Sequence, residues 1–256
     1  METLLVMGDG HPGSVVGLTP PGWWQSKNFK FHDTQVKLWK EFDDILNQIH
    51  RDWPSPTTLI CVGDMVHGKE HKQGGVETIT GDVEEQAEIG IAIFEHIGIK
   101  NIYMVYGTPY HTDVQGQKME QSIAKHFDAV AGNRIFPVIN GIRFDIRHHI
   151  PTSTLPESRP RIIATQWSRA RDWFMEGVQP LPDILIRGHA HYYSEARGTS
   201  GNGEWFAFTC PGLQGLGSSF GERRCDGVIH FGMVILAFNG DTPICKPYIR
   251  RPQIIE

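Results

Sequence analysis

The chain has little of what would point to a secreted or membrane protein. Its four cysteines are scattered through 256 residues, and no close pair suggests a zinc knuckle or a redox motif. No apolar run reaches the roughly 18 residues that a membrane-spanning helix needs. The apolar start, Met1 to Asp9, lacks the basic region and the cleavage site of a signal peptide. We therefore expect a first strand there, and a cytoplasmic protein without membrane contact.

Basic tracts are also missing. No run of lysine and arginine is long enough to predict tight nucleic-acid binding, and the net charge is −5. The glycine-rich segment 212–221 lacks the Gly-Lys-Ser/Thr of a phosphate-binding loop. Between residues 131 and 256, however, 13 of the 14 basic residues are arginines. Guanidinium forks match phosphate oxygens, so this half can supply a phosphate-binding face; ordinary surface arginines are the alternative.

What the first half does contain is an alternation of strand and helix patterns. Short apolar runs alternate with segments whose apolar residues recur on one helical face. Such repetition predicts a parallel sheet covered by helices. The expected strands are Leu4–Met7, Thr58–Val62 and Asn101–Tyr106, and the expected helices carry Leu38, Phe42, Ile45 and Ile49, then Ala87, Ile91 and Phe94, then Met119, Ile123, Phe127 and Val130.

The pattern changes after about residue 133. Asn140–Gly141 is a two-residue hairpin signal between two strands, and one helix is expected near 162–174. Further strands are expected at 184–187, 205–209, 228–238 and 243–249. With no internal repeat and no linker, we predict a single domain over residues 1–256, an α/β fold with two packed sheets flanked by helices.

Histidines and aspartates follow the strands of this predicted fold. In an α/β sheet, functional residues lie just past the carboxyl ends of strands, and residues i and i+2 can share a face. Each short motif alone is weak evidence, but five in succession at strand ends are not expected by chance. They predict a metal site made of Asp9–Gly10–His11, Gly63–Asp64, His111, His148–His149 and Gly188–His189–Ala190–His191.

The order of these motifs resembles that of the calcineurin-like metallophosphoesterase superfamily. That family carries D-x-H, G-D, G-N-H, a histidine after a later strand, and G-H-x-H, and the match runs from Asp9 to His191. The resemblance implies a four-layer α/β/β/α sandwich of two mixed sheets, with a dinuclear metal site at the strand ends.

The resemblance also implies a role for each matching residue. Asp9, His11 and His191 correspond to ligands of one metal ion. His149 and His189 correspond to ligands of the other, and Asp64 to the carboxylate that bridges them. His149 is preferred over His148 because it stands two residues before Pro151, as the family's histidine often does.

The third motif departs from the family. Where the family has G-N-H, this chain has Gly107–Thr108–Pro109–Tyr110–His111, so the asparagine ligand is missing. This variant is similar to small members encoded by bacteriophages and prophages. The resemblance makes His111 the group that protonates the leaving oxygen, unless His111 replaces the asparagine as a ligand. His67, three residues past Asp64, is expected either to touch substrate or to orient a ligand.

We therefore expect a phosphodiesterase with two divalent metal ions, acting on a phosphate ester such as a nucleotide or nucleic acid. Two cations bind phosphoryl oxygens and acidify a bridging water, so that hydroxide forms near neutral pH. Mixed imidazole and carboxylate ligands favour Mn²⁺, with Zn²⁺, Fe, Ni²⁺ or Co²⁺ as alternatives. A nuclease is one form of this prediction. A phosphomonoesterase or nucleotidase is the rival enzyme, and a non-catalytic binding protein on the same fold is the third reading.

Overall fold

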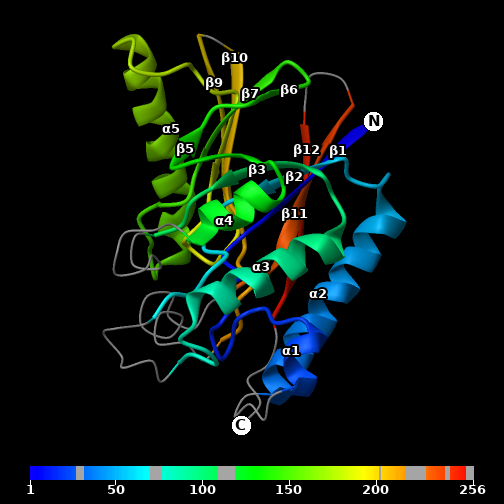
Figure 1. The fold of residues 1–256 in the computed structure, drawn as a ribbon. Coiled ribbons are helices and arrows are strands. Elements are labelled where there is room, and N and C mark those ends of the chain that lie inside the picture. The colour runs from blue at the N-terminus through cyan, green and yellow to red at the C-terminus, as the bar shows by residue number, and fades with distance from the viewer. Residues whose placement is uncertain are drawn as a thin grey trace.

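Two stacked β-sheets form the centre of the molecule in the computed structural model, which describes residues 1–26, 32–69, 77–108, 119–201, 203–216, 229–239 and 243–251 (Figure 1). The first sheet has the order β12-β11-β1-β2-β3-β4. Strands β1 to β4 are parallel, whereas β11 and β12 add an antiparallel edge. Its strands are β1 (Glu2–Met7), β2 (Thr58–Cys61), β3 (Asn101–Val105), β4 (Val130–Gly132), β11 (Phe231–Phe238) and β12 (Pro243–Arg250).

The second sheet has the order β5-β7-β8-β10-β9, with β6 paired to β7. Its three central strands, β7, β8 and β10, are parallel. The predicted hairpin at Asn140–Gly141 joins β6 to β7, and both turn residues have the positive φ that such a turn needs. The strands are β5 (Arg134–Ile135), β6 (Val138–Ile139), β7 (Ile142–Arg147), β8 (Ile184–Arg187), β9 (Ser194–Ser200) and β10 (Gly203–Thr209).

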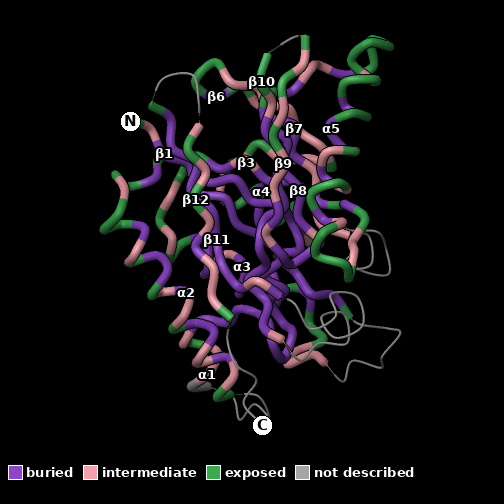
Figure 2. Tube along the Cα trace, turned by 180° about the vertical axis from the view of Figure 1, so that it is seen from behind, coloured by how far each residue is buried: buried purple, intermediate pink, exposed green. Residues whose placement is uncertain are grey.

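Helices cover the outer faces of both sheets, which confirms the predicted α/β/β/α layering (Figure 1). Helices on one side pack on the first sheet, and α5 packs on the second. Figure 2 shows the buried residues along the strands and the exposed ones along the outer faces of α2 and α5. The helices are α1 (Pro21–Ser26), α2 (His32–Asp52), α3 (Val83–Ile97), α4 (Met119–His126) and α5 (Arg159–Met175), with a short 3₁₀ turn at Pro156–Ser158.

Alternation along the strands places the core on both sides of the first sheet. Leu4 and Val6 face the second sheet, where they meet side chains such as Phe144. Leu5 and Met7 face the helices instead. The parallel strands are therefore apolar on both faces, as expected for a sheet covered on both sides.

The helices begin and end where the sequence supplies caps and an apolar stripe. In α2 the four residues of the predicted stripe, at positions 38, 42, 45 and 49, are all buried. At the start of α3 the Asp82 carboxylate accepts hydrogen bonds from the Glu84 and Glu85 N–H groups. Gly98 ends α3 in the left-handed conformation with φ 74°.

Two strands differ from the expectation. Val130 was expected on the third helix, but the chain leaves α4 after His126, and Val130 begins β4 beside Tyr103. Asp128, with φ 50°, makes the turn between helix and strand. Strand β9 was not predicted because its sequence, Ser194–Ser200, is polar; it pairs only with β10 at the edge of its sheet.

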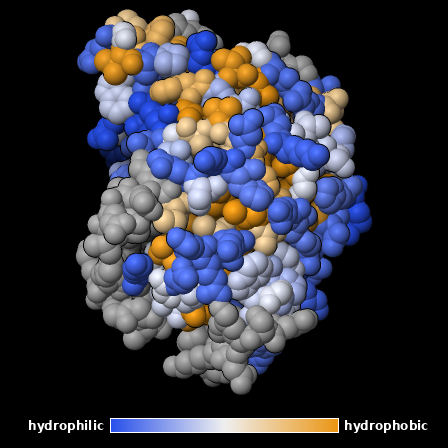
Figure 3. Space-filling view, in the orientation of Figure 1, coloured by the Kyte–Doolittle hydropathy of each residue, from blue (hydrophilic) through white to orange (hydrophobic). Residues whose placement is uncertain are grey.

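No helix in the described part of the chain is long and apolar enough to cross a membrane. On the face drawn in Figure 3, hydrophilic and hydrophobic residues are interspersed in small groups.

Candidate metal centre

The carboxyl ends of four strands meet at one edge of the two sheets. Beyond β1 and β2, the N–H of Asp9 bonds to the oxygen of Gly63 (2.8 Å), and that of His11 to the oxygen of Asp64 (2.9 Å). Beyond β7 and β8 the N–H of Gly188 bonds to the oxygen of His148 (2.9 Å). These backbone bonds place the predicted motifs side by side, as the strand-end rule requires.

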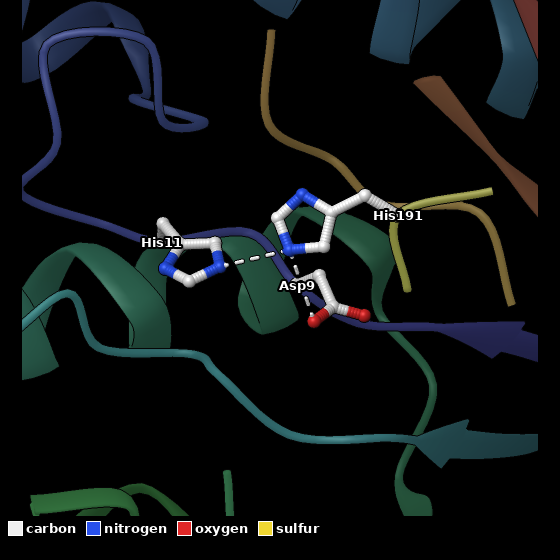
Figure 4. A group of neighbouring side chains, drawn as sticks. All are labelled: Asp9, His11 and His191. Atoms are coloured by element: carbon white, nitrogen blue, oxygen red, sulfur yellow. Dashed lines mark hydrogen bonds and ion pairs between the residues drawn. The ribbon is translucent and has the colours of Figure 1, made fainter. Parts of the chain in front are cut away.

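Asp9, His11 and His191 form the first group of metal-ligand atoms (Figure 4). The Nε2 atoms of the two imidazoles lie 3.3 Å apart, and His191 Nε2 lies 3.4 Å from Asp9 Oδ1. All three residues are buried, with at most 5% of their surface exposed. The rings come from loops 180 residues apart in sequence, and Figure 4 shows them turned toward one another.

Asp64, His148 and His189 form the second group. His148 Nε2 lies 3.0 Å from Asp64 Oδ2, and the His148 and His189 rings pack edge to face with centroids 5.2 Å apart. The same Asp64 oxygen lies 3.8 Å from His11 Nε2 in the first group. Asp64 is therefore the residue that joins the two groups.

Neighbouring backbone fixes the Asp64 carboxylate. Thr108 donates its N–H to Asp64 Oδ1 (2.8 Å), and its hydroxyl lies 3.0 Å from Oδ2. A Cβ on Gly107 would lie 1.8 Å from Asp64 Oδ1, so only glycine leaves room for the carboxylate. Thr108, the residue after Gly107, thus holds Asp64 by hydrogen bonds.

The candidate ligands share an uncommon backbone conformation. Of the seven non-glycine residues with positive φ in the described chain, five are members of the two groups. A left-handed backbone is unfavourable for residues with a Cβ and is often found at functional sites. The five, with φ between 43° and 66°, are Asp9, His11, Asp64, His189 and His191.

Hydrogen bonding orients the His148 ring for ligation. Its Nδ1 lies 2.8 Å from the carbonyl oxygen of Val62, so Nδ1 carries the proton and donates it. The buried Nε2 then points at Asp64 Oδ2, 3.0 Å away, and without a cation it carries a proton that pairs with this carboxylate; a metal ion would take the place of that proton. A second ring nitrogen tied to a backbone carbonyl is the usual arrangement of a metal-binding histidine.

Electrostatics in the two groups favour a bound cation. Burial by itself lowers the pKa of His148, but the charges of Asp64 and Asp9 outweigh burial and raise that pKa to about 10. Burial, with His148 as a second cause, lowers the pKa of His189 to about 4, so this imidazole is neutral at pH 7. The carboxylates thus attract positive charge to a place where a neutral imidazole is available as a ligand.

The spacing of the ligand atoms suits a metal ion. Ligands that lie about 2.0–2.1 Å from a zinc-sized ion are about 3 to 3.4 Å from one another. The His11–His191 and Asp64–His148 distances of 3.3 Å and 3.0 Å match this spacing. Two imidazoles and a carboxylate in each group are a suitable donor set for Mn²⁺, Zn²⁺ or iron.

His149 lies outside both groups, contrary to the preference that the sequence suggested. It is exposed and stacks on the His189 ring with centroids 4.9 Å apart, while His148 occupies the site. The two histidines follow the end of β7 and their side chains point in different directions, so that His148 is buried beside Asp64 and His149 is exposed.

Of the two histidines predicted to be catalytic, His67 is among the described residues and His111 is not. His67 is buried, and its Nδ1 lies 3.5 Å from His11 Nδ1, the ring nitrogen opposite the one in the metal group. Gln86 holds the loop of His67 by accepting the backbone N–H groups of His67 and Gly68. His111 lies outside the described residues.

Glu120 is a further residue of the site that the sequence did not reveal. Its Oε1 accepts the Met65 N–H (2.8 Å) and its Oε2 the Gly107 N–H (2.5 Å). Burial, together with the charge of Asp64, raises the pKa of Glu120 to about 7. No local pattern marks this glutamate, because both of its partners come from other loops.

The fold and site thus define a two-sheet α/β sandwich with paired Asp/His groups at one edge. The sequence matches no family model and no curated protein. Among solved structures, the chain is similar to a novel archaeal phosphodiesterase, with 16% identity, a TM-score of 0.46 and coverage of 97% of this chain and 99% of that one. A Thermotoga maritima protein gives 13% identity, a TM-score of 0.41 and coverage of 98% and 100%.

Another similar structure is the sulfate thiohydrolase SoxB of Thermus thermophilus, with 10% identity and a TM-score of 0.43. The match covers 97% of this chain and 56% of SoxB. Likenesses this distant do not bear on the activity of this chain, which has to be inferred from its own residues.

Proposed function

We propose that this chain is a phosphodiesterase that depends on two divalent metal ions. The observation that carries the proposal is the pair of Asp/His groups, buried except for the half-buried His189, that Asp64 joins. A site with two adjacent cations would suit in-line displacement at phosphorus, because such ions would activate the attacking water and offset the negative charge that builds up on the leaving oxygen. We favour Mn²⁺, with Zn²⁺, Fe, Ni²⁺ or Co²⁺ as alternatives.

In this proposal Asp9, His11 and His191 hold one ion, and His148 and His189 the other. Asp64 contacts both. The chemistry that such ions supply when bound is neutralisation of phosphoryl oxygens and acidification of a water molecule. Thr108 and Glu120 are positioning residues, since each fixes the loop or the carboxylate of Asp64 through hydrogen bonds.

Two histidines are assigned supporting roles. We assign His67 to the orientation of His11, because its ring contacts the outer nitrogen of His11. His111 keeps its proposed role as proton donor to the leaving oxygen, which an imidazole can fulfil near neutral pH.

The test is metal-dependent turnover of bis-p-nitrophenyl phosphate compared with p-nitrophenyl phosphate. After chelation, Mn²⁺ should restore hydrolysis of the diester, and Asp64→Asn should lower kcat by more than about 100-fold. Asp128→Asn is the matched control, because Asp128 is exposed and also has positive φ. Full activity in excess EDTA or in Asp64→Asn would rule out the metal-dependent reading, and preference for the monoester would favour a phosphomonoesterase.

A further inference from the structure

A pocket of about 460 Å³ opens beside the second ligand group. His148 and Thr108, both part of the candidate metal centre, line one side of it. The other side is formed by helix α5 through Gln166, Arg169 and Trp173. A volume of this size accommodates a nucleotide-sized molecule, so the pocket can hold the part of a substrate next to the reacting phosphorus.

Arg147 brings positive charge into this pocket. It precedes His148 at the end of β7 and points to the opposite side of the strand, the side that His149 shares. The buried Asp145 carboxylate is its acidic partner, at 3.4 Å from Nε. Arg134 and Arg187 approach the same carboxylate more closely, at 2.7 Å and 3.2 Å.

Three guanidinium groups therefore share one carboxylate, which leaves an excess of positive charge around Asp145. Nη2 of Arg147 is buried and has no hydrogen-bond partner within the described chain. A buried guanidinium donor without an acceptor is costly, and an anionic ligand in the pocket would satisfy it.

Arg169 supplies a second positive charge from α5. It is exposed, and it forms no ion pair with a carboxylate in the described ranges. Among the described residues that line the pocket, Glu120 is the acidic one, and its oxygens accept the N–H groups of Met65 and Gly107. The charge that faces the pocket is therefore predominantly positive.

We propose that this pocket binds a second phosphate of the substrate, next to the phosphate that is cleaved. The substrate class is then a nucleotide-like diester that carries a flanking phosphate, held by the guanidinium forks of Arg147 and Arg169. This inference rests on the proposed phosphodiesterase function and narrows its substrate.

The hydrolysis test compares two chromogenic esters, thymidine 5′-(p-nitrophenyl phosphate) with and without a 3′-phosphate. The chain should prefer the 3′-phosphorylated ester by about tenfold in kcat/KM, mostly through KM, as one charged hydrogen-bond partner contributes. Arg169→Gln should lower the ratio between the two esters clearly, because only Arg147 then remains to bind the flanking phosphate. Arg161→Gln, an exposed arginine of the same helix that does not line the pocket, should keep the ratio.

A binding measurement separates this inference from the proposed function. Thymidine 3′,5′-bisphosphate is titrated calorimetrically into metal-free protein in EDTA, with thymidine as the uncharged comparison. The bisphosphate should bind more tightly than thymidine, and Arg169→Gln should weaken it about tenfold while Arg161→Gln does not. If the bisphosphate binds more tightly than thymidine and Arg169→Gln weakens it, but neither ester is hydrolysed, the phosphate-binding pocket is supported and the phosphodiesterase proposal is refuted. The inference about the pocket would be overturned if both esters were hydrolysed equally well. It would also be overturned if wild type, Arg169→Gln and Arg161→Gln bound the bisphosphate equally tightly.

Discussion

At the level of single residues, the backbone conformation of the candidate ligands is as informative as their chemistry. Asp9, His11, Asp64, His189 and His191 all adopt a left-handed backbone, at a cost on the order of 1 kcal/mol each. The sharp turn lets residues i and i+2 of one loop direct their side chains at the same point. The metal-free protein is therefore less stable than its core alone would allow.

This cost can be measured at His11, whose φ is 43°. In EDTA we expect His11→Gly to be more stable than His11→Ala by about 1 kcal/mol, because glycine tolerates positive φ and alanine does not. The measurement is urea unfolding of both variants. At the exposed helical position His50 the order should reverse, with glycine less stable than alanine by about 1 kcal/mol. Equal stability of the two His11 variants would contradict the strained turn.

At the level of elements, the site depends on loops being held in register. Glu120 at the start of α4 links the loop after β2 to the loop after β3 by accepting one N–H from each. Glutamine has a single oxygen, so Glu120→Gln keeps only one of these bonds. We expect this variant to bind Mn²⁺ about 10- to 100-fold more weakly, while saturating Mn²⁺ still fills both sites.

Isothermal titration of Mn²⁺ into wild type and Glu120→Gln measures that difference. Gln121→Ala, an exposed change on the same helix, should bind Mn²⁺ like the wild type. An affinity unchanged in Glu120→Gln would mean that the two loops keep their register without this carboxylate.

The elements themselves were largely predictable because apolar periodicity specifies them locally. The stripe of α2 and the apolar runs of β1, β2, β3 and β8 match the structure closely. Strand β9 escaped prediction because a polar edge strand is defined by its partner β10, not by its own sequence. Val130 was wrongly predicted to be helical, because the helical spacing of apolar residues continues beyond the end of α4.

The proximity of the candidate ligands was predictable from their places at strand ends, but the finer contacts around them were not. Asp9, His11, Asp64, His189 and His191 fall into two groups as the motif order indicates. The choice between His148 and His149 depends on which face of β7 is buried, a tertiary property. Glu120 and Asp145 act through partners that lie far from them in sequence, so no local pattern could identify them.

At the level of the whole molecule, Asp145 and its arginines connect stability to pH. Burial alone would raise the pKa of Asp145, but Arg187, Arg134 and Arg147 outweigh it and hold that pKa well below its usual range. In the unfolded chain the carboxyl takes up a proton near pH 3.9, about its ordinary pKa. Its stabilising contribution is therefore complete above that pH and is lost as the pH falls toward the folded-state pKa.

We expect Asp145→Asn to lower the free energy of unfolding at pH 7 by about 3–5 kcal/mol, because it leaves the buried Arg187 without its counter-charge. Urea unfolding in EDTA at pH 7 and pH 3 measures the change. The difference in unfolding free energy between wild type and variant should narrow at pH 3, because the unfolded wild-type chain takes up a proton on Asp145 below about pH 3.9 while the folded chain keeps this carboxylate ionised. An equal difference in unfolding free energy at pH 7 and pH 3 would contradict the stabilising role of the ionised Asp145.

We propose above all that each of the two ligand groups holds one metal ion, and that Asp64 contacts both ions. Anomalous X-ray diffraction from crystals grown with Mn²⁺ tests it most directly. We expect two peaks about 3.5–4 Å apart, one beside Asp9, His11 and His191 and the other beside His148 and His189. A single peak, no peak at this edge of the sheets, or a peak bound by His149 in place of His148 would contradict it.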